Sequence, residues 1–190
     1  MSSKEVSSYE LRVTGGSSPH VPIDNRQSTI DNPRLAAIWS ALESVTDPEI
    51  PVLSVVDLGI IAGVHLSEGA VIVEMTPTFV GCPALDVIRG ELRRAVEATG
   101  ERNVEVRVVF DPPWTSERMT ETGRRKLKEF GLAPPVRCAS TTATTADAPV
   151  PCPHCDSDRT DLESLFGPTL CRSIHYCRNC LQSFEHFKAP

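Results

Sequence analysis

The sequence predicts an α+β domain followed by a small C-terminal β-ribbon that a metal ion holds together. Three observations support this fold class. Segments of helical and of strand periodicity alternate between residues 32 and 137. Small polar residues without periodicity follow over 138–150, and five of the seven cysteines then fall between Cys152 and Cys180. The chain has 190 residues, enough for one compact domain and a smaller module.

The charge balance and the hydropathy argue against several classes of protein. A formal net charge of −6 gives no reason to expect a nucleic acid or an anionic membrane as partner. The longest apolar run, Leu58 to Val64, is interrupted by two glycines and is far too short for a bilayer span. The first twenty residues lack the apolar core of a secretory signal, so we expect a cytoplasmic protein. In that reducing compartment, clustered cysteines indicate metal binding or catalysis rather than disulfides.

The first expected helix begins near residue 32. Residues 1–31 are rich in Ser, Gly and polar residues, and we expect them to form a disordered extension. Asn32 can cap a helix and Pro33 suits its first turn, whereas Pro48 prevents the helix from continuing. The apolar residues of this segment recur at helical spacing: Leu35, Ile38, Trp39, Leu42 and Val45.

The remaining elements of the first domain follow in order. Residues 63–66 and 70–75 predict two strands joined by a Glu-Gly turn. A helix over 84–99, a strand over 103–110 and a last helix over 120–130 come next. Alternation in the second strand predicts that one set of its side chains is better buried: Val71, Val73 and Met75. This order predicts a two-layer domain over 32–137 with the helices on one face of the sheet.

The C-terminal segment, residues 151–190, contains two cysteine pairs and follows an expected flexible linker over 138–150. The pairs are "CPHC" (Cys152, Cys155) and "CRNC" (Cys177, Cys180), and twenty-one residues separate them. Each pair presents two sulfurs from one tight turn, and two such turns complete a tetrahedron around zinc. A segment this short buries little apolar surface, so metal binding would supply most of its folding free energy, about 10 kcal/mol.

Two features of this module leave alternatives open. Cys171, six residues before the second pair, is a spare thiol, an alternative ligand or part of an iron–sulfur site. Zinc is the first choice because paired cysteine turns suit it, but the sequence alone does not separate zinc from an iron–sulfur cluster. His154, His175 and His186 are interpreted as surface or packing residues.

The charge of residues 151–190 argues against a nucleic-acid-binding ribbon. The segment has four basic residues (Arg159, Arg172, Arg178, Lys188) and five acidic residues (Asp156, Asp158, Asp161, Glu163, Glu185). Binding to phosphates requires a cationic surface. We therefore expect the ribbon to contact protein.

Cys82, in "TFVGCPAL", lies between an expected strand and a helix that would begin at Pro83. Free amides and the helix dipole at such a position lower the pKa of a thiol, which makes it a better nucleophile and a better ligand for soft metals. Asp57 and Thr76 would reach the same edge if the loops fold back. The alternatives are that Cys82 is a small buried hydrophobic residue and that Asp57 is a turn or capping residue.

Three separated motifs resemble one known family. "VTDPEIPVLSVVDLGII", "TPTFVGCP" and "FDPPWTSERMTETGRRKLKEFGLAPP" are similar, in order and spacing, to the metal–sulfur cluster assembly domain of SufT-like iron–sulfur targeting factors. The resemblance covers about Pro33 to Pro135. With the C-terminal "CPHC … ESLFGPTLCRSIHYCRNCLQSFEHFK", the chain resembles the PaaD family of phenylacetate-degradation proteins, encoded with the subunits of phenylacetyl-CoA epoxidase.

The resemblance implies an accessory protein of the epoxidase system rather than a stable subunit of its core. Expected partners are the diiron oxygenase or the iron–sulfur reductase of that system and the iron–sulfur assembly machinery, and a homodimer is implied as well. The family's functional cysteine carries over to Cys82, with Asp57 and Thr76 as weaker matches. The metal ligands carry over to Cys152, Cys155, Cys177 and Cys180, and Cys171 matches a further cysteine of the family's ribbon.

From these observations we expect Cys82 to bind iron, an iron–sulfur cluster or a partner's cysteine transiently, while a zinc-bearing ribbon docks the client. Two rivals remain: an electron-carrying or structural component of the epoxidase with a ribbon-bound cluster, and a regulatory zinc-ribbon protein. An enzyme that acts alone is not expected, because no general base adjoins Cys82 in the sequence.

Overall fold

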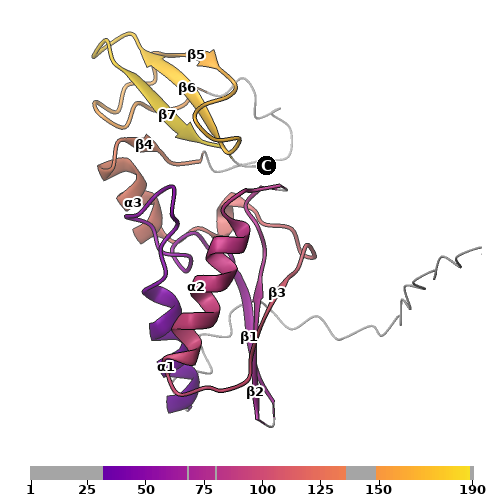
Figure 1. The fold of residues 1–190 in the computed structure, drawn as a ribbon. Helices are drawn as coiled ribbons and strands as arrows, with labels where there is room; N and C mark the ends of the chain where they lie inside the picture. Colours follow the sequence, from indigo (N-terminus) through magenta and orange to yellow (C-terminus); the bar gives the residue numbers. More distant parts are fainter. Residues whose placement is uncertain (1–31, 68, 80, 136–148, 189–190) are drawn as a thin grey trace, which may run out of the picture.

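The computed structural model describes residues 32–67, 69–79, 81–135 and 149–188. The expected disordered extension over 1–31 lies outside these residues, as does most of the expected linker over 138–150. Figure 1 shows two stacked parts. We call residues 32–135 the N-terminal domain and residues 149–188 the ribbon.

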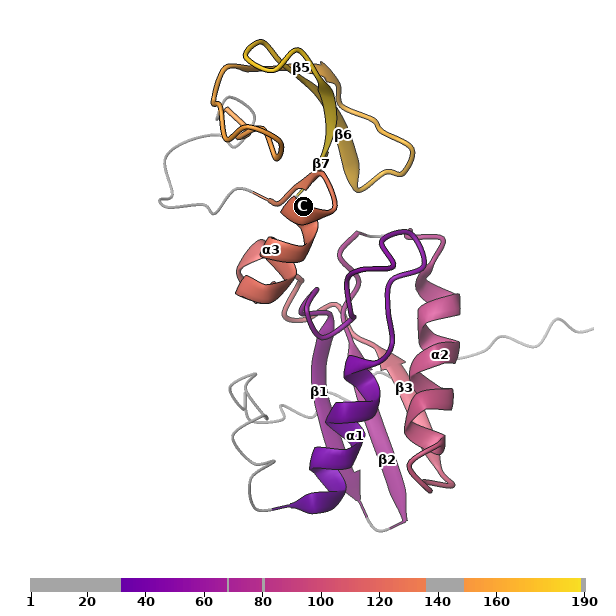
Figure 2. The ribbon, with the colours of Figure 1, turned by 90° about the vertical axis from the view of Figure 1, so that its left-hand side faces the viewer.

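Two helices cover one face of the first sheet (Figures 1 and 2). Helix α1 spans Pro33–Glu43 and is capped as expected, since the Asn32 side chain accepts hydrogen bonds from the amides of Arg34 at 3.1 Å and Leu35 at 3.2 Å. Helix α2 spans Leu85–Glu97. The two helices bury one apolar stripe each: Leu35, Ile38 and Leu42 in α1, and Ile88, Leu92 and Val96 in α2.

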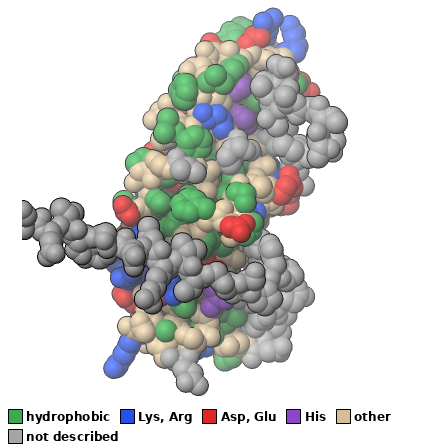
Figure 3. Space-filling model, turned by 90° about the vertical axis from the view of Figure 1, so that its right-hand side faces the viewer, with side chains coloured by type: hydrophobic (Ala, Val, Ile, Leu, Met, Phe, Trp, Pro, Cys, Tyr) green, Lys and Arg blue, Asp and Glu red, His purple; other side chains and the backbone are tan. Residues whose placement is uncertain are grey.

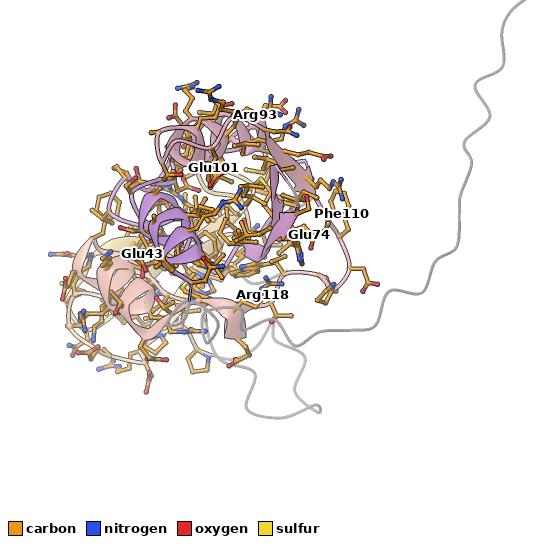
Figure 4. All side chains as sticks on the ribbon, turned by 90° about the horizontal axis from the view of Figure 1, so that it is seen from below. Glu43, Glu74, Arg93, Glu101, Phe110 and Arg118 are labelled. Carbon is orange, nitrogen blue, oxygen red and sulfur yellow. The ribbon has the colours of Figure 1, made fainter. Side chains whose placement is uncertain are left out.

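The first sheet has the order β1-β2-β3. Strand β1 (Ile61–Ser67) pairs antiparallel with β2 (Ala70–Met75), and β2 pairs parallel with β3 (Val104–Val108). The expected alternation is confirmed, because Val71, Val73 and Met75 are fully buried. Figure 4 shows Glu74 and Phe110 on the side of the sheet away from α1. The two-layer prediction is therefore confirmed for α1 and α2, whereas the last helix, over Glu121–Glu129, contacts β4 (Leu132–Ala133) instead of this sheet (Figure 1).

The chain after β3 packs against the segment that precedes β1. Trp114 is buried, and its Nε1 donates a hydrogen bond to the carbonyl oxygen of Leu58 at 2.9 Å. The side chain of Arg118, labelled in Figure 4, donates from Nε to the carbonyl oxygen of Gly59 at 3.0 Å. Gly59 has a φ of +69°, and a Cβ there would lie 2.0 Å from the Arg118 carbonyl oxygen. The close approach therefore requires glycine at this position.

The second sheet has the order β4-β7-β6-β5. Strands β5 (Thr160–Ser164), β6 (Arg172–Cys177) and β7 (Ser183–Phe187) belong to the ribbon and pair antiparallel. Strand β4 (Leu132–Ala133) follows helix α3 (Glu121–Glu129) in the N-terminal domain and pairs parallel with β7. Strand pairing thus crosses the boundary near residue 137 that the sequence suggests.

The ribbon also shares apolar contacts with the N-terminal domain. Phe187, on β7, is buried in the same core cluster as Trp114, and the two rings meet edge to face with centroids 6.1 Å apart. Cys171 packs partly against this cluster from the ribbon, and Cys82 does so from the N-terminal domain. The interface between the two parts is therefore packed and not only tethered. No helix among the described residues is long and apolar enough to cross a membrane.

Candidate functional site

The first candidate site is a group of four cysteine sulfurs in the ribbon: Cys152, Cys155, Cys177 and Cys180. All four sulfurs lie within 4.8 Å of one another, and two pairs, Cys152–Cys180 and Cys155–Cys177, are 3.6 Å apart. Zinc–sulfur bonds of about 2.3 Å in a tetrahedron place the sulfurs about 3.8 Å apart. The described cysteines therefore fit a tetrahedrally bound metal ion.

The two cysteine turns have the same local geometry. The residue after the second cysteine of each pair has a positive φ, 58° at Asp156 and 60° at Leu181. Each turn is closed by an amide, since Asp156 donates to the Cys152 carbonyl and Leu181 donates to the Cys177 carbonyl, both at 2.9 Å. A side chain in this backbone region costs about 1 kcal/mol, which metal binding can offset.

The thiols of this group differ in pKa. Hydrogen bonds from the amides of Cys180 and Asn179 lower the pKa of Cys177 to about 6, against the effect of burial. Burial and sulfur neighbours raise the pKa of Cys180 to about 12. Zinc binds cysteine as the thiolate, so a cation among the four sulfurs would displace the remaining thiol protons and balance the negative charge.

Cys171 and the three histidines lie outside this four-sulfur group. Cys171 precedes β6, and its sulfur lies 3.2 Å from the Thr169 hydroxyl oxygen. His175 stacks on Phe184 at a centroid distance of 5.6 Å and His154 is exposed, so packing and surface roles fit them. Among the described residues, no donor beyond the four cysteines joins a group of three or more metal-ligating atoms.

The second candidate site surrounds Cys82, in the loop between β2 and α2. The sulfur is half-buried. Helix α2 begins at Leu85 instead of Pro83, and no side chain caps it. The expectation of a lowered pKa is wrong: burial raises the pKa of Cys82, and negative charge at Asp47, Cys171 and Glu49 raises it further, although the Ala84 amide acts in the opposite direction. The loss of solvent contact outweighs the helix start.

Asp47 and Glu49 are functional candidates that sequence reasoning missed. They follow α1 in the loop "DPEIP", and the Asp47 side chain accepts hydrogen bonds from the amides of Glu49 at 2.7 Å and Ile50 at 3.0 Å. Burial raises the pKa of Asp47, while these amide hydrogen bonds lower it in part. The signal was present, because the first motif of the family resemblance contains both residues. Their approach to Cys82 depends on the tertiary fold.

Arg172 connects this loop to the ribbon. Its Nη2 donates to the carbonyl oxygen of Glu49 at 2.7 Å, and its Nη1 pairs with the Glu185 carboxylate at 2.8 Å. Only 9% of the Arg172 side chain is exposed. Arg172 therefore holds the start of β6 against the loop that contains Glu49.

Asp57 lies against the start of α3, and its side chain contacts residues of that helix and its cap. Its carboxylate accepts a hydrogen bond from the Thr120 hydroxyl at 2.9 Å and pairs with the Lys126 ammonium at 2.6 Å. Burial alone would raise the pKa of Asp57, but the hydrogen bonds from Lys126 and Thr120 lower it overall. Thr76 is buried, and its amide donates to the carbonyl oxygen of Ile60 at 2.8 Å. These contacts fit structural roles for Asp57 and Thr76 in the N-terminal domain.

Two of the four basic side chains of the ribbon form ion pairs with carboxylates. Arg172 pairs with Glu185, and Arg178 makes a two-pronged ion pair with Asp161, with one contact of 2.7 Å. On the face seen in Figure 3, acidic and basic side chains of the described residues are interspersed and form no basic patch. This charge distribution is poorly suited to binding phosphates.

Family models match both parts of the chain. Residues 35–108 match the family of iron–sulfur cluster assembly proteins, and residues 136–188 match the PaaD zinc beta ribbon domain. A Bacillus subtilis Fe-S protein maturation auxiliary factor, YitW, is 39% identical over 47% of this chain and 89% of its own length. A crystal structure of a Bacillus anthracis domain of unknown function is 29% identical, covering 54% of this chain and 97% of its own, with a TM-score of 0.47.

One relative extends over nearly the whole chain. This Escherichia coli protein, described as a putative subunit of 1,2-phenylacetyl-CoA epoxidase, is 39% identical over 164 residues, which cover 86% of this chain and 98% of that protein. Both the assembly domain and the ribbon are therefore shared with it. The chain belongs to the PaaD family.

Proposed function

We propose that this protein is a cytoplasmic accessory factor that matures a metal centre of the phenylacetyl-CoA 1,2-epoxidase system. Cys82 is the thiol that holds iron or an iron–sulfur cluster on its way to a client subunit, and the iron is cargo. The main support is the surroundings of Cys82: a half-buried sulfur beside Asp47 and Glu49, outside any closed four-ligand cage. Relatives named as Fe-S protein maturation factors support the same class of function.

The ribbon has a structural role in this proposal, with zinc as its resident ion. Four cysteines and no other described donor form the group, which suits zinc as a closed structural site. Bound there, zinc would neutralise the thiolates and stabilise both turns. The ribbon then presents its exposed surface to the client.

Exposed apolar side chains precede Cys171 within the ribbon. Leu165, Phe166 and Leu170 are 60%, 64% and 50% exposed in the connection between β5 and β6. Lys188 donates from Nζ to the Leu165 carbonyl at 2.8 Å and lies 5.1 Å from the centre of the Phe166 ring. The connection is thus held in place while its apolar groups face solvent. We propose that the client contacts this segment because it continues into the thiol region.

A complementation experiment tests the proposed role of Cys82. A strain that carries Cys82→Ser should fail to grow on phenylacetate and should contain epoxidase subunits with a reduced iron content. Val87→Ser, at a half-exposed position on α2, is the matched control and should complement fully. Normal growth of the Cys82→Ser strain would exclude the role of this thiol.

Metal and sulfide analysis of anaerobically purified protein tests the ribbon. A colourless sample with one zinc ion per chain and no sulfide is expected. A coloured sample that contains iron and sulfide in the ribbon would instead support the electron-carrying rival.

A further inference from the structure

The first cysteine turn of the ribbon lies against the segment that joins α3 to β4 in the N-terminal domain. Lys128, near the end of α3, forms an ion pair with Asp156, which directly follows Cys155 and has a positive φ. A Cβ at Gly131 would lie 3.3 Å from a ring carbon of His154, which belongs to the same turn. Two residues of the N-terminal domain thus contact a metal-binding turn from outside the ribbon.

Buried side chains are exchanged between the two parts of the molecule. Ala133 of β4 belongs to the buried cluster of the ribbon, which contains Cys152 and Cys177 of the four-sulfur group. Leu132, the residue before it, belongs to the core of the N-terminal domain, as does Phe187 of β7. Ala133 and both cysteines are fully buried. The N-terminal domain therefore supplies part of the apolar wall around the proposed zinc site.

A second set of contacts joins β6 and β7 to the N-terminal domain. Arg172 is almost fully buried and donates to the Glu49 carbonyl oxygen at 2.7 Å. Burial of a guanidinium is costly unless its hydrogen bonds are made, so Arg172 depends on this carbonyl. Phe187 meets the Trp114 ring edge to face. A ribbon that has lost its metal and unfolded cannot make these contacts.

We propose that zinc binding by the ribbon and docking of the ribbon on the N-terminal domain are one coupled equilibrium. A folded ribbon makes the interface contacts and an unfolded one does not, so the free energy of docking adds to the apparent zinc affinity. By thermodynamic linkage, zinc strengthens docking by the same factor. A partner that displaces the ribbon from the N-terminal domain should therefore weaken zinc binding. This inference goes beyond the proposed function and does not involve Cys82.

The zinc affinity of the full-length chain tests this coupling, measured by competition with a chromophoric zinc chelator under reducing conditions. Phe187→Ala should weaken zinc binding at least about tenfold, although Phe187 is no zinc ligand and packs in the core of the N-terminal domain. Phe166→Ala is the matched control, because that ring is 64% exposed, and should bind zinc as the wild type does. Wild-type zinc affinity in Phe187→Ala would overturn the coupling.

A second pair of variants lies in the N-terminal domain and leaves the sequence of the ribbon unchanged. Lys128→Ala breaks the ion pair with Asp156 and should weaken zinc binding about threefold, since a partly exposed ion pair contributes little. Arg125→Ala is the matched control, because its ion pair with Glu129 lies within α3, and its zinc affinity should equal that of the wild type. Equal zinc affinities of the two variants would contradict a contribution of the N-terminal domain to the zinc site.

Hydrogen exchange tests the coupling in the reverse direction. Removal of zinc from the wild type with a chelator should speed the exchange of peptides that contain β4 at least about tenfold, because β7 no longer pairs with this strand. Peptides from β2, in the centre of the first sheet, are the control and should exchange at the same rate with and without zinc. Unchanged exchange at β4 after zinc removal would overturn the inference.

Discussion

The two cysteine sites of this molecule differ in how the groups around each site are distributed along the chain. The ribbon group is built by two turns with matched backbone geometry, and its four sulfurs surround one point. Around Cys82, the neighbouring groups come from three separate segments: the loop after α1, the loop before α2 and the start of β6. A closed set suits an ion that holds a fold together, whereas an incomplete set suits an ion that leaves. A thiol with a raised pKa also binds its ion only after losing a proton, which favours release.

The largest expected effect comes from breaking the closed site. Cys177→Ala removes one sulfur of four and with it most of the metal binding free energy, about 10 kcal/mol. We expect loss of zinc and rapid proteolysis of the ribbon, measured by metal analysis and limited trypsin digestion. Cys82→Ser is the control and should keep its zinc. An intact, zinc-containing Cys177→Ala protein would contradict a structural role for the site.

A smaller effect is expected from the contact that joins the two parts. Phe187→Ala leaves a cavity beside Trp114 and should lower the free energy of unfolding by about 3–4 kcal/mol. Urea unfolding followed by tryptophan fluorescence measures the change. The control is Phe166→Ala, since that ring is 64% exposed and its loss should change the stability by no more than about 0.5 kcal/mol. Equal effects of the two substitutions would mean that the contact between Phe187 and Trp114 does not stabilise the interface.

The interface should also weaken in mild acid. Burial, with smaller contributions from the charges of His175 and Lys188, lowers the pKa of His186 to about 4, and its Nε2 is buried without a hydrogen-bond partner. Since the unfolded chain takes up the proton near pH 6.5, stability is lost as pH falls from that value toward 4. Between pH 7 and pH 5 this amounts to about 2 kcal/mol.

Urea unfolding at the two pH values, with zinc in excess, measures this loss. His186→Gln should lose about 2 kcal/mol less than the wild type over the same interval, because the titrating group is gone. Zinc-linked effects are common to both proteins and cancel in the difference. Parallel pH dependences of the two proteins would show that His186 does not carry the effect.

The smallest expected effect tests whether Asp57 has a structural role. Asp57→Asn removes the charge paired with Lys126 and weakens the hydrogen bond from Thr120, which should cost about 1–2 kcal/mol of stability. The Asp57→Asn strain should still grow on phenylacetate as the wild type does. Asp86→Asn, at an exposed position on α2, is the control and should change neither quantity. Loss of growth in a strain whose Asp57→Asn protein is folded would assign this residue to the Cys82 site instead.

The sequence predicts features that depend on neighbours along the chain. The cap at Asn32, the alternation in β2 and both cysteine pairs follow from local spacing, and the structure places them as expected. The approach of Asp47 to Cys82 and the pairing of β4 with β7 arise from tertiary contacts that no periodicity encodes. The local pattern predicts the wrong direction for the pKa of Cys82 for the same reason. Burial and remote charges decide it, and both are invisible in "TFVGCPAL".

Because β4 pairs with β7, the two parts of the molecule are joined by more than the covalent connection between them. Two residues of one part extend the sheet of the other, and Phe187 reaches back from that sheet into the core of the first. A single peptide bond cut within residues 136–148 should therefore yield two fragments that stay together through gel filtration. The zinc-dependent sheet would hold the two fragments together. A chelator that removes the zinc should therefore separate them, whereas the protease cut alone should not.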